Sequence, residues 1–193
     1  MRTLAANVTL SLDGFSAGPD RFDMSWLVPH ALDDGCRARF AEIYAPATTA
    51  LLGRTNFEGF HGFWTPIADD PAADPRDRAY ATWQNSVDKI VFSTTLTEVP
   101  GPNARLATRS LTDEVADLRE QDGGDILVLS SASIIRALLE TDQLDVLHLL
   151  VVPAILGGGL TIWPSDVRTD WHLENVTTLA SGATYQTHRR ARV

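Results

Sequence analysis

Residues 146–159 read Val-Leu-His-Leu-Leu-Val-Val-Pro-Ala-Ile-Leu-Gly-Gly-Gly, and this stretch decides how the fold is interpreted. Its first half has the continuous apolar character of a strand that is covered on both faces, and Pro153 ends it. The three glycines that follow suit positive φ angles or a close approach of backbone. Two interpretations are open: a wide loop or bulge between core segments, or a loop whose backbone lies against a bound molecule.

Other apolar runs are spaced so that helices fit between them. The pattern predicts strands at 3–10, 48–52, 89–93 and 125–129, and helices at 32–43, 112–120 and 132–140. Segments 171–180 and 184–192 alternate around Ser181-Gly182-Ala183, which is typical of a hairpin. We therefore expect one α/β domain over residues 1–193, with a mainly parallel sheet and antiparallel edge strands. Segments 14–29 and 65–78 have no clear pattern, and we expect the second to be a surface excursion.

Composition excludes several classes of protein. A chain of 193 residues with 44% hydrophobic and 21% charged residues is typical of one soluble globular domain. No apolar run reaches the roughly 20 residues that a membrane span needs, and the N-terminus lacks the apolar region of a signal peptide. The single cysteine, Cys36, excludes an internal disulfide and is expected to be a semi-buried helix residue. We therefore expect a cytoplasmic protein without a metal site.

The net charge of −9 argues against nucleic acid as a partner, because nucleic-acid affinity rests on neutralising phosphates. One basic cluster departs from this balance, His188-Arg189-Arg190-Ala191-Arg192. We interpret it as a solvated strand end and tail, with phosphate binding as the less favoured alternative. The five histidines have no metal-ligand spacing, and His148 is expected in the core or on a face of the sheet.

Three predicted strand ends carry residues that can hold phosphate: Gly53-Arg54-Thr55, Ser93-Thr94-Thr95 and Ser130-Ser131-Ala132-Ser133. In a parallel sheet such ends meet at one edge, against the N-termini of helices. Each segment alone is an ordinary cap or turn, whereas the three together indicate a phosphorylated ligand. The sequence contains no Gly-x-Ser-x-Gly, P-loop or Gly-x-Gly-x-x-Gly motif.

Five segments occur in an informative order. They read Ser-Leu-Asp-Gly-Phe-Ser-Ala-Gly at 11–18, Leu-Leu-Gly-Arg-Thr-Asn-Phe-Glu at 51–58, Lys-Ile-Val-Phe-Ser-Thr-Thr-Leu at 89–96, Gly-Asp-Ile-Leu-Val-Leu-Ser-Ser-Ala at 124–132 and Pro-Ala-Ile-Leu-Gly-Gly-Gly at 153–159. In this order they resemble the dihydrofolate reductase superfamily, most closely the branch typified by the C-terminal reductase domain of bacterial riboflavin biosynthesis. The resemblance spans essentially the whole chain. It implies a three-layer α/β fold with a mainly parallel sheet of about eight strands, a C-terminal antiparallel hairpin, and NADPH as hydride donor.

The resemblance also implies which residues contact the cofactor. Gly53, Arg54 and Thr55 would hold a cofactor phosphate, Ser93 and Thr94 would meet the adenosine 2′-phosphate, and Ser130, Ser131, Ala132 and Ser133 would cradle the pyrophosphate.

The segment 13–26 would form a mobile loop over the nicotinamide, with backbone groups of Ser16 and Ala17 offered to its carboxamide. Asp13 and Trp26 are the candidate catalytic residues. Asp13 either faces the substrate or caps its own turn. Trp26 either stacks on the substrate or packs within the loop.

The chain departs from the family pattern at three positions. Ser130 stands where a glycine is usual, and Asn56 stands where the pattern Gly-Arg-x-Thr has its threonine. Folate reductases join a Gly-Gly pair at 130–131 by a cis bond; a non-proline cis peptide costs about 3–4 kcal/mol, so none is assumed here. Their substrate-binding carboxylate would fall near Ala31, and neither Asp33 nor Asp34 aligns with it. This weakens dihydrofolate as the substrate.

We therefore expect an NADPH-dependent reductase of a small heterocycle. The substrate would be a ribosylaminopyrimidine, as in 5-amino-6-(5-phosphoribosylamino)uracil reductase, or a pterin-like compound. Three alternatives stay open: a nucleotide-binding member without turnover, a reductase of an unrelated small molecule, and, less favoured, a flavin-using reductase. A homodimer is also expected, with the apolar segment that ends at Leu156 as a candidate contact. The glycines at 157–159 are then expected to lead to the closing hairpin, near the site.

Overall fold

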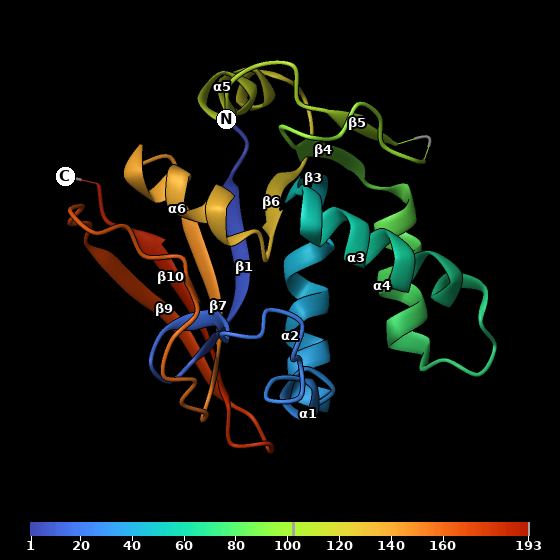
Figure 1. Cartoon of the computed structure of the whole chain (residues 1–193), viewed down its shortest axis with the longest axis vertical. Helices are drawn as coiled ribbons and strands as arrows, with labels where there is room; N and C mark the ends of the chain where they lie inside the picture. Colours follow the sequence, from blue (N-terminus) through green and yellow to red (C-terminus); the bar gives the residue numbers. More distant parts are fainter. Residues whose placement is uncertain (102, 193) are drawn as a thin grey trace.

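The chain is built around an eight-stranded sheet in the order β5-β4-β3-β6-β1-β7-β10-β9 (Figure 1). The computed structural model describes residues 1–101 and 103–192. Neighbouring strands from β5 to β7 are parallel, whereas β10 pairs antiparallel with both β7 and β9. The strands are β1 (Leu4–Ser11), β3 (Ala47–Gly53), β4 (Asp88–Phe92), β5 (Ala104–Leu106), β6 (Asp125–Leu129), β7 (Val146–Val152), β9 (Trp171–Thr178) and β10 (Thr184–Arg190). The expected α/β fold with a closing hairpin is confirmed.

Helices cover both faces of this sheet, which makes three layers (Figure 1). Along β1, Leu4, Val8 and Leu10 pack into the core under α5 and α6, whereas Ala5 packs into the core under α2 and α3. Burial on both faces explains why the central strands read as continuous apolar runs. None of the described helices is both long and apolar enough to cross a membrane. The helices are α1 (Val28–Ala31), α2 (Asp34–Tyr44), α3 (Arg54–Trp64), η1 (Thr65–Asp69, a 3₁₀ helix), α4 (Pro75–Ser86), α5 (Leu111–Glu120) and α6 (Ala132–Glu140).

The segment 65–78 lies at the surface as expected, since none of its residues is buried, but it has regular structure that its pattern did not indicate. The segment holds η1 and the first turn of α4. The Asp74 side chain accepts a hydrogen bond from the N–H of Arg76 at 2.9 Å, and Pro75 occupies the first turn of the helix. Asp followed by Pro is a helix-start signal, but α4 has little apolar periodicity behind it, because only Tyr80, Ala81 and Gln84 are buried.

The segment 14–29 also has more structure than its pattern indicated. It contains β2 (Phe15–Ala17), which pairs with β8 (Leu160–Thr161) in a second, two-stranded sheet, and α1 begins at its end. This pairing explains the last of the three glycines. Gly159 has φ +133°, and a Cβ placed on it would lie 2.0 Å from the carbonyl oxygen of Ala17. The glycine turn therefore connects β7 to β8 with its backbone pressed against β2.

Candidate cofactor site

The three segments expected to hold phosphate all follow strands at one edge of the sheet. β3 ends at Gly53, the first residue of segment 53–55. β4 ends at Phe92 and β6 at Leu129, directly before the other two segments. β3 pairs in parallel with both β4 and β6, so these ends lie next to one another. We call the segments 53–55, 93–95 and 130–133 the carboxyl edge.

A hydrogen-bonded junction joins two parts of the carboxyl edge. The backbone N–H of Gly53 donates to Oγ of Ser131 at 2.9 Å, and that hydroxyl donates to the carbonyl oxygen of Leu129 at 3.0 Å. The side-chain amide of Asn56 donates to the same carbonyl at 3.2 Å. A Cβ placed on Gly53 would lie 3.9 Å from the Ser133 hydroxyl. The starts of α3 and α6 are thus held together.

Neither of these helix starts is capped by a side chain. α3 begins after Gly53 and α6 after Ser131, and neither of these N-cap residues makes a side-chain hydrogen bond to the first turn. First-turn N–H groups carry the positive end of the helix dipole. Ala132 is buried at the start of α6, whereas the side chains of Thr55 and Ser133 are exposed. This arrangement suits an anion such as a phosphate.

Arg54, the one cation at the start of α3, has a partner on its own helix. Its NH1 atom lies 2.9 Å from Oε2 of Glu58, and both side chains are about half exposed. Exposed pairs with this spacing are worth about 0.3–0.5 kcal/mol, so a phosphate can compete for the guanidinium.

Ser93 shapes the turn that follows β4. Its hydroxyl oxygen accepts hydrogen bonds from the N–H groups of Thr95 and Leu96, at 3.1 and 2.9 Å. Thr94, which follows Ser93, is exposed. The contact of Ser93 and Thr94 with an adenosine 2′-phosphate stays a prediction.

The backbone conformation at Ser130 explains why a glycine is usual at this position. Its φ is +48°, in the left-handed region where a side chain is unfavourable, and its N–H donates to the carbonyl oxygen of Asn7 at 2.9 Å. No cis peptide bond occurs among the described residues, so the Ser130–Ser131 bond is trans.

Asp13 binds the backbone of the glycine turn. Its carboxylate accepts hydrogen bonds from Oγ of Ser11 at 2.6 Å and from the N–H groups of Leu156 and Gly157 at 3.1 and 2.8 Å. The Ser11 hydroxyl and these amides hold the pKa of Asp13 below its ordinary value. A carboxylate held in this way anchors a loop, and its catalytic role stays a prediction.

Ser16 and Ala17 lie in β2, next to the same turn. The Ser16 hydroxyl donates to the carbonyl oxygen of Leu160 at 3.1 Å, and Ala17 pairs with Leu160 across the two-stranded sheet. The loop segment expected over the nicotinamide is therefore attached to β8 at this point. Contact of these residues with a carboxamide stays a prediction.

Trp26 is half-buried and packs against the core under α2 and α3. Its indole Nε1 is buried and has no hydrogen-bond partner among the described residues. Buried polar atoms are usually paired, so an unpaired donor leaves room for an acceptor from a water or a ligand. Contact of Trp26 with a substrate stays a prediction.

The two aspartates near the expected carboxylate position have other partners. Asp33 caps α2, accepting from the N–H groups of Gly35 at 2.8 Å and Cys36 at 3.4 Å, and it also accepts from the N–H of Ser181 at 2.9 Å. The Ser181 amide, with those two, lowers the pKa of Asp33. Asp34 pairs with Arg76 at 2.8 Å. Asp33 thus serves the fold, whereas Asp34 is 85% exposed and is held only by a surface ion pair.

Asn7 is a polar residue of the central strand that the sequence reasoning did not select. Its side-chain oxygen accepts a hydrogen bond from the hydroxyl of Tyr185, and its carbonyl oxygen accepts from Ser130. Tyr185 is fully buried on β10. An asparagine in the apolar first half of a central strand was the available signal. It connects the carboxyl edge to the closing hairpin.

The sheet order and the helices on both of its faces give the fold of the dihydrofolate reductase type. The chain belongs to the RibD C-terminal domain family, whose model matches residues 2–185. It is similar to the uncharacterized protein YyaP of Bacillus subtilis strain 168, with 28% identity over 185 residues, 94% of this chain and 91% of that protein.

Solved structures share the fold. A putative riboflavin biosynthesis protein from Shewanella sp. PV-4 superposes with a TM-score of 0.74 at 22% identity, covering 98% of this chain and 99% of that one. The deaminase and 5-amino-6-(5-phosphoribosylamino)uracil reductase of Thermotoga maritima gives 0.66 at 18% identity, over 98% of this chain and 57% of that one. Enterococcus faecalis dihydrofolate reductase, complexed with NADP(H), gives 0.59 at 17% identity, over 98% and 97%.

Proposed function

We propose that this protein is an NADPH-dependent reductase that transfers a hydride to a small heterocyclic substrate. One observation carries the proposal: two uncapped helix starts are joined by the Gly53–Ser131 hydrogen bond, with Arg54 beside them. Family membership and the fold shared with a reductase that binds NADP(H) support the choice of cofactor.

The chain's own groups would bind and orient the cofactor. Arg54 and the first turn of α3 would take one phosphate, with Ser93 and Thr94 at the adenosine 2′-phosphate, and residues 130–133 would hold the pyrophosphate. When bound, NADPH supplies the hydride, so the protein is needed for positioning and for the exclusion of water. Segment 13–26, tied down at Asp13 and β2, would provide that cover.

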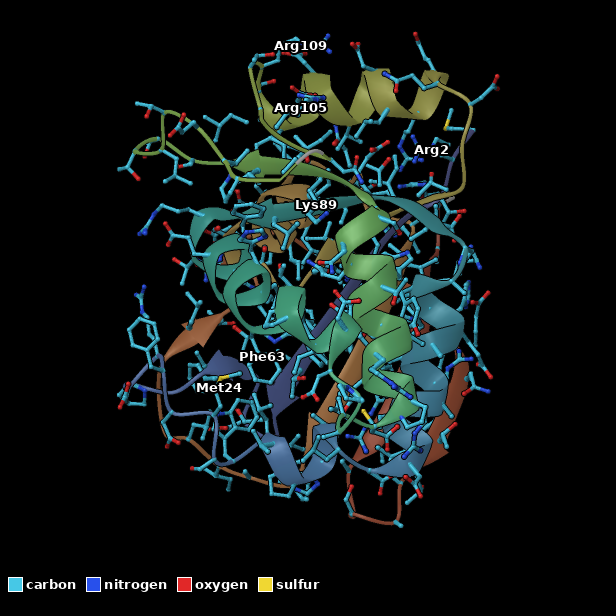
Figure 2. All side chains as sticks on the ribbon, turned by 90° about the vertical axis from the view of Figure 1, so that its right-hand side faces the viewer. Arg2, Met24, Phe63, Lys89, Arg105 and Arg109 are labelled. Carbon is cyan, nitrogen blue, oxygen red and sulfur yellow. The ribbon has the colours of Figure 1, made fainter. Side chains whose placement is uncertain are left out.

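The state of the acids near the expected carboxylate position bears on the substrate class. Asp33 is engaged as a helix cap, and neither Asp33 nor Asp34 aligns with the family's carboxylate, which argues against a pterin held by a carboxylate at this place. We therefore rank a ribosylaminopyrimidine or an unrelated heterocycle above dihydrofolate. Exposed Met24 and Phe63, on the side of the molecule seen in Figure 2, add apolar surface that suits a planar ring.

Titration of the protein with NADPH, followed by fluorescence or calorimetry, tests the cofactor. We expect saturable binding that Arg54→Gln weakens by about tenfold, because a charge-assisted hydrogen bond is lost. Arg168→Gln is the matched control, since Arg168 is 88% exposed and lies between β8 and β9, outside the carboxyl edge. No binding of NADPH at millimolar concentration would overturn the proposal.

A binding protein without turnover is the second candidate, and the engaged state of Asp33 favours it. NADPH oxidation measured across pterins, ribosylaminopyrimidines and quinones separates the two candidates. Tight NADPH binding without oxidation in any reaction would favour the binder. A yellow purified protein would instead favour a flavin-using reductase.

A homodimer is part of the proposal. Ile155 is 73% exposed and Leu12 is 64% exposed, and a hydrogen bond from Leu12 N to the Ala154 carbonyl at 2.8 Å joins their segments. Paired apolar surface of this kind suits a second copy of the chain. Light scattering after size exclusion tests it, and Ile155→Lys is expected to shift a dimer toward monomer. A strict monomer in the parent protein would remove this part.

A further inference from the structure

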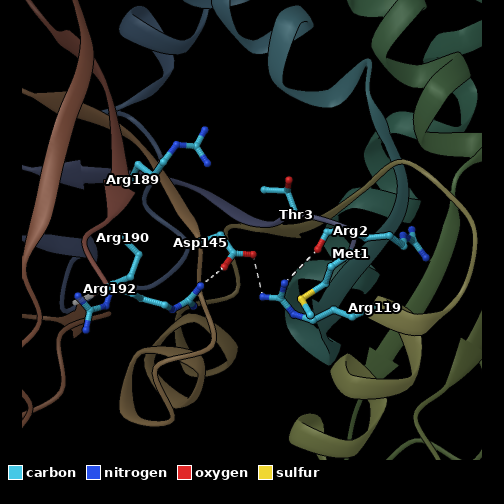
Figure 3. A pocket seen from close by; sticks show the side chains of 8 residues that line it. All are labelled: Met1, Arg2, Thr3, Arg119, Asp145, Arg189, Arg190 and Arg192. Carbon is cyan, nitrogen blue, oxygen red and sulfur yellow. Dashed lines mark hydrogen bonds and ion pairs between the residues drawn. The ribbon is translucent and has the colours of Figure 1, made fainter.

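The basic cluster at the end of the chain lines a pocket at the opposite edge of the sheet from the carboxyl edge. The pocket has a volume of about 280 Å³ and holds five arginines but one acid, Asp145. The whole chain has 16 Lys and Arg against 25 Asp and Glu, so this concentration reverses the overall balance. Figure 3 shows Arg189, Arg190 and Arg192 on one side of Asp145 and Arg119 on the other.

Asp145 is shared between two of these cations. Its Oδ2 atom lies 2.8 Å from NH2 of Arg119, and its other oxygen pairs with Arg192. Burial opposes ionisation, but the N–H of Leu4 and the two guanidinium groups hold the pKa of Asp145 below its ordinary value. Asp145 is therefore a carboxylate, and a single negative charge faces two positive ones.

The remaining arginines differ in how far they are engaged. Arg2 points into the strand ends, where it donates to Thr49 at 2.7 Å and to the Gly124 carbonyl at 2.6 Å. Arg190 is held by Asp142 and by the Asp170 carbonyl, and its side chain is 12% exposed.

Arg189 has unpaired N–H donors. Only its Nε atom bonds Glu174, and its two terminal nitrogens have no hydrogen-bond partner among the described residues. Its side chain is 53% exposed. Leaving Arg2 aside, four arginines around the pocket thus face three acids, Asp142, Asp145 and Glu174. The unused donors belong to the planar guanidinium group of Arg189, whose geometry matches tetrahedral oxyanions.

We infer that this pocket is a second anion site, which takes a phosphate group carried by inorganic phosphate or by a small phosphomonoester. A phosphate group carries enough negative charge to compensate this single surplus positive charge. It would accept hydrogen bonds from the two terminal nitrogens of Arg189. The Asp145 pairs stay in place. The bonds from Arg192 NH2 to the carbonyl oxygens of Asp142 and Leu144 stay in place as well. The pocket volume admits a phosphate with a small organic part. The site lies away from the cofactor segments, so its occupant differs from the NADPH of the proposed function.

Calorimetric titration of the whole protein at low ionic strength tests the site, with inorganic phosphate in one arm and glycerol 3-phosphate in the other. Arg189→Gln is expected to weaken binding by about tenfold. Glu174→Gln, which frees the Arg189 guanidinium, is expected to strengthen binding by about threefold. Both side chains are substantially exposed, so neither change threatens the fold, and equal unfolding midpoints verify this.

Two variants serve as controls. Arg168→Gln removes an exposed arginine outside the pocket and is expected to leave the phosphate affinity unchanged. Arg54→Gln tests whether phosphate binds at the carboxyl edge instead. Phosphate binding that is lost in Arg54→Gln and kept in Arg189→Gln overturns the inference, as does the absence of binding in both arms. A preference for glycerol 3-phosphate supports it and identifies the phosphomonoester as the ligand.

Discussion

The carboxylate of Asp13 lies 2.8 Å from the backbone nitrogen of Gly157, which follows 144 residues later in the chain. This contact ties the end of the central strand β1 to the glycine turn after β7. Gly159 completes the attachment, because its backbone meets the carbonyl oxygen of Ala17. The loop expected over the cofactor therefore depends on a turn that belongs to the far end of the sequence.

Asp13→Asn should loosen this attachment. The neutral amide accepts hydrogen bonds more weakly, so the Leu156 and Gly157 amides should exchange with solvent faster, as measured by hydrogen exchange. The lowered pKa of Asp13 means that its contribution is present above its unfolded pKa and lost as pH falls through the folded value. Near neutral pH the difference from the parent should be constant. The matched control is Asp166→Asn, an exposed carboxylate outside the turn; equal exchange in all three proteins would contradict the anchor role.

Gly159→Ala should be strongly destabilising. The new Cβ would lie 2.0 Å from the Ala17 carbonyl oxygen, and φ is +133°. The strain alone costs on the order of 1–3 kcal/mol in the free energy of unfolding, measured with urea. Gly158→Ala, at the preceding residue, is the control, because nothing lies within 4 Å of a Cβ placed on Gly158. Similar losses in both variants would show that the close contact does not matter.

Ser131→Ala and Ser133→Ala should separate folding from binding. Ser131 is 3% exposed and accepts from Gly53 N, so its loss leaves a partly buried N–H unpaired and should cost about 1–2 kcal/mol of stability. Ser133 is exposed, and its replacement should change stability by less than about 0.5 kcal/mol. Under the proposed function Ser133→Ala should still weaken NADPH binding. Urea unfolding and NADPH titration measure the two effects, and a Ser133 variant that binds normally would remove that residue from the site.

His148 should make stability depend on pH. Burial, helped by Arg39 on α2 and Arg189 on β10 and opposed by Glu174 on β9, lowers the pKa of His148 from 6.5 to about 4. Between these values the unfolded chain binds a proton that the folded chain does not, so the free energy of unfolding falls as pH decreases. The loss reaches about 3 kcal/mol at pH 4.

The measurement is urea unfolding between pH 4 and 7. His148→Gln keeps a polar side chain that can meet Thr187 and should flatten this dependence, whereas the exposed His172→Gln should not. A parent protein and a His148→Gln variant with the same pH dependence would exclude His148 as its cause.

Much of the fold could be predicted from the sequence because apolar periodicity reports burial directly. The strands at 125–129 and 146–152 and the helix at 132–140 agree with the structure, since each has a strong apolar face. α4 could not be predicted in this way, because it buries few residues and is fixed by a cap and by aromatic contacts such as Tyr80 with Trp83.

The sequence by itself determined the order of the strongly apolar strands and helices, the family, and the small polar residues that end the central strands. Only the tertiary structure decided how those residues are used. It joined Gly53 to Ser131, committed Asp13 to the glycine turn and Asp33 to a helix cap, and gathered the terminal arginines around Asp145. The physical reason is that periodicity records which face of an element is buried. The partner of a polar group is set by packing between distant segments, which no local pattern contains.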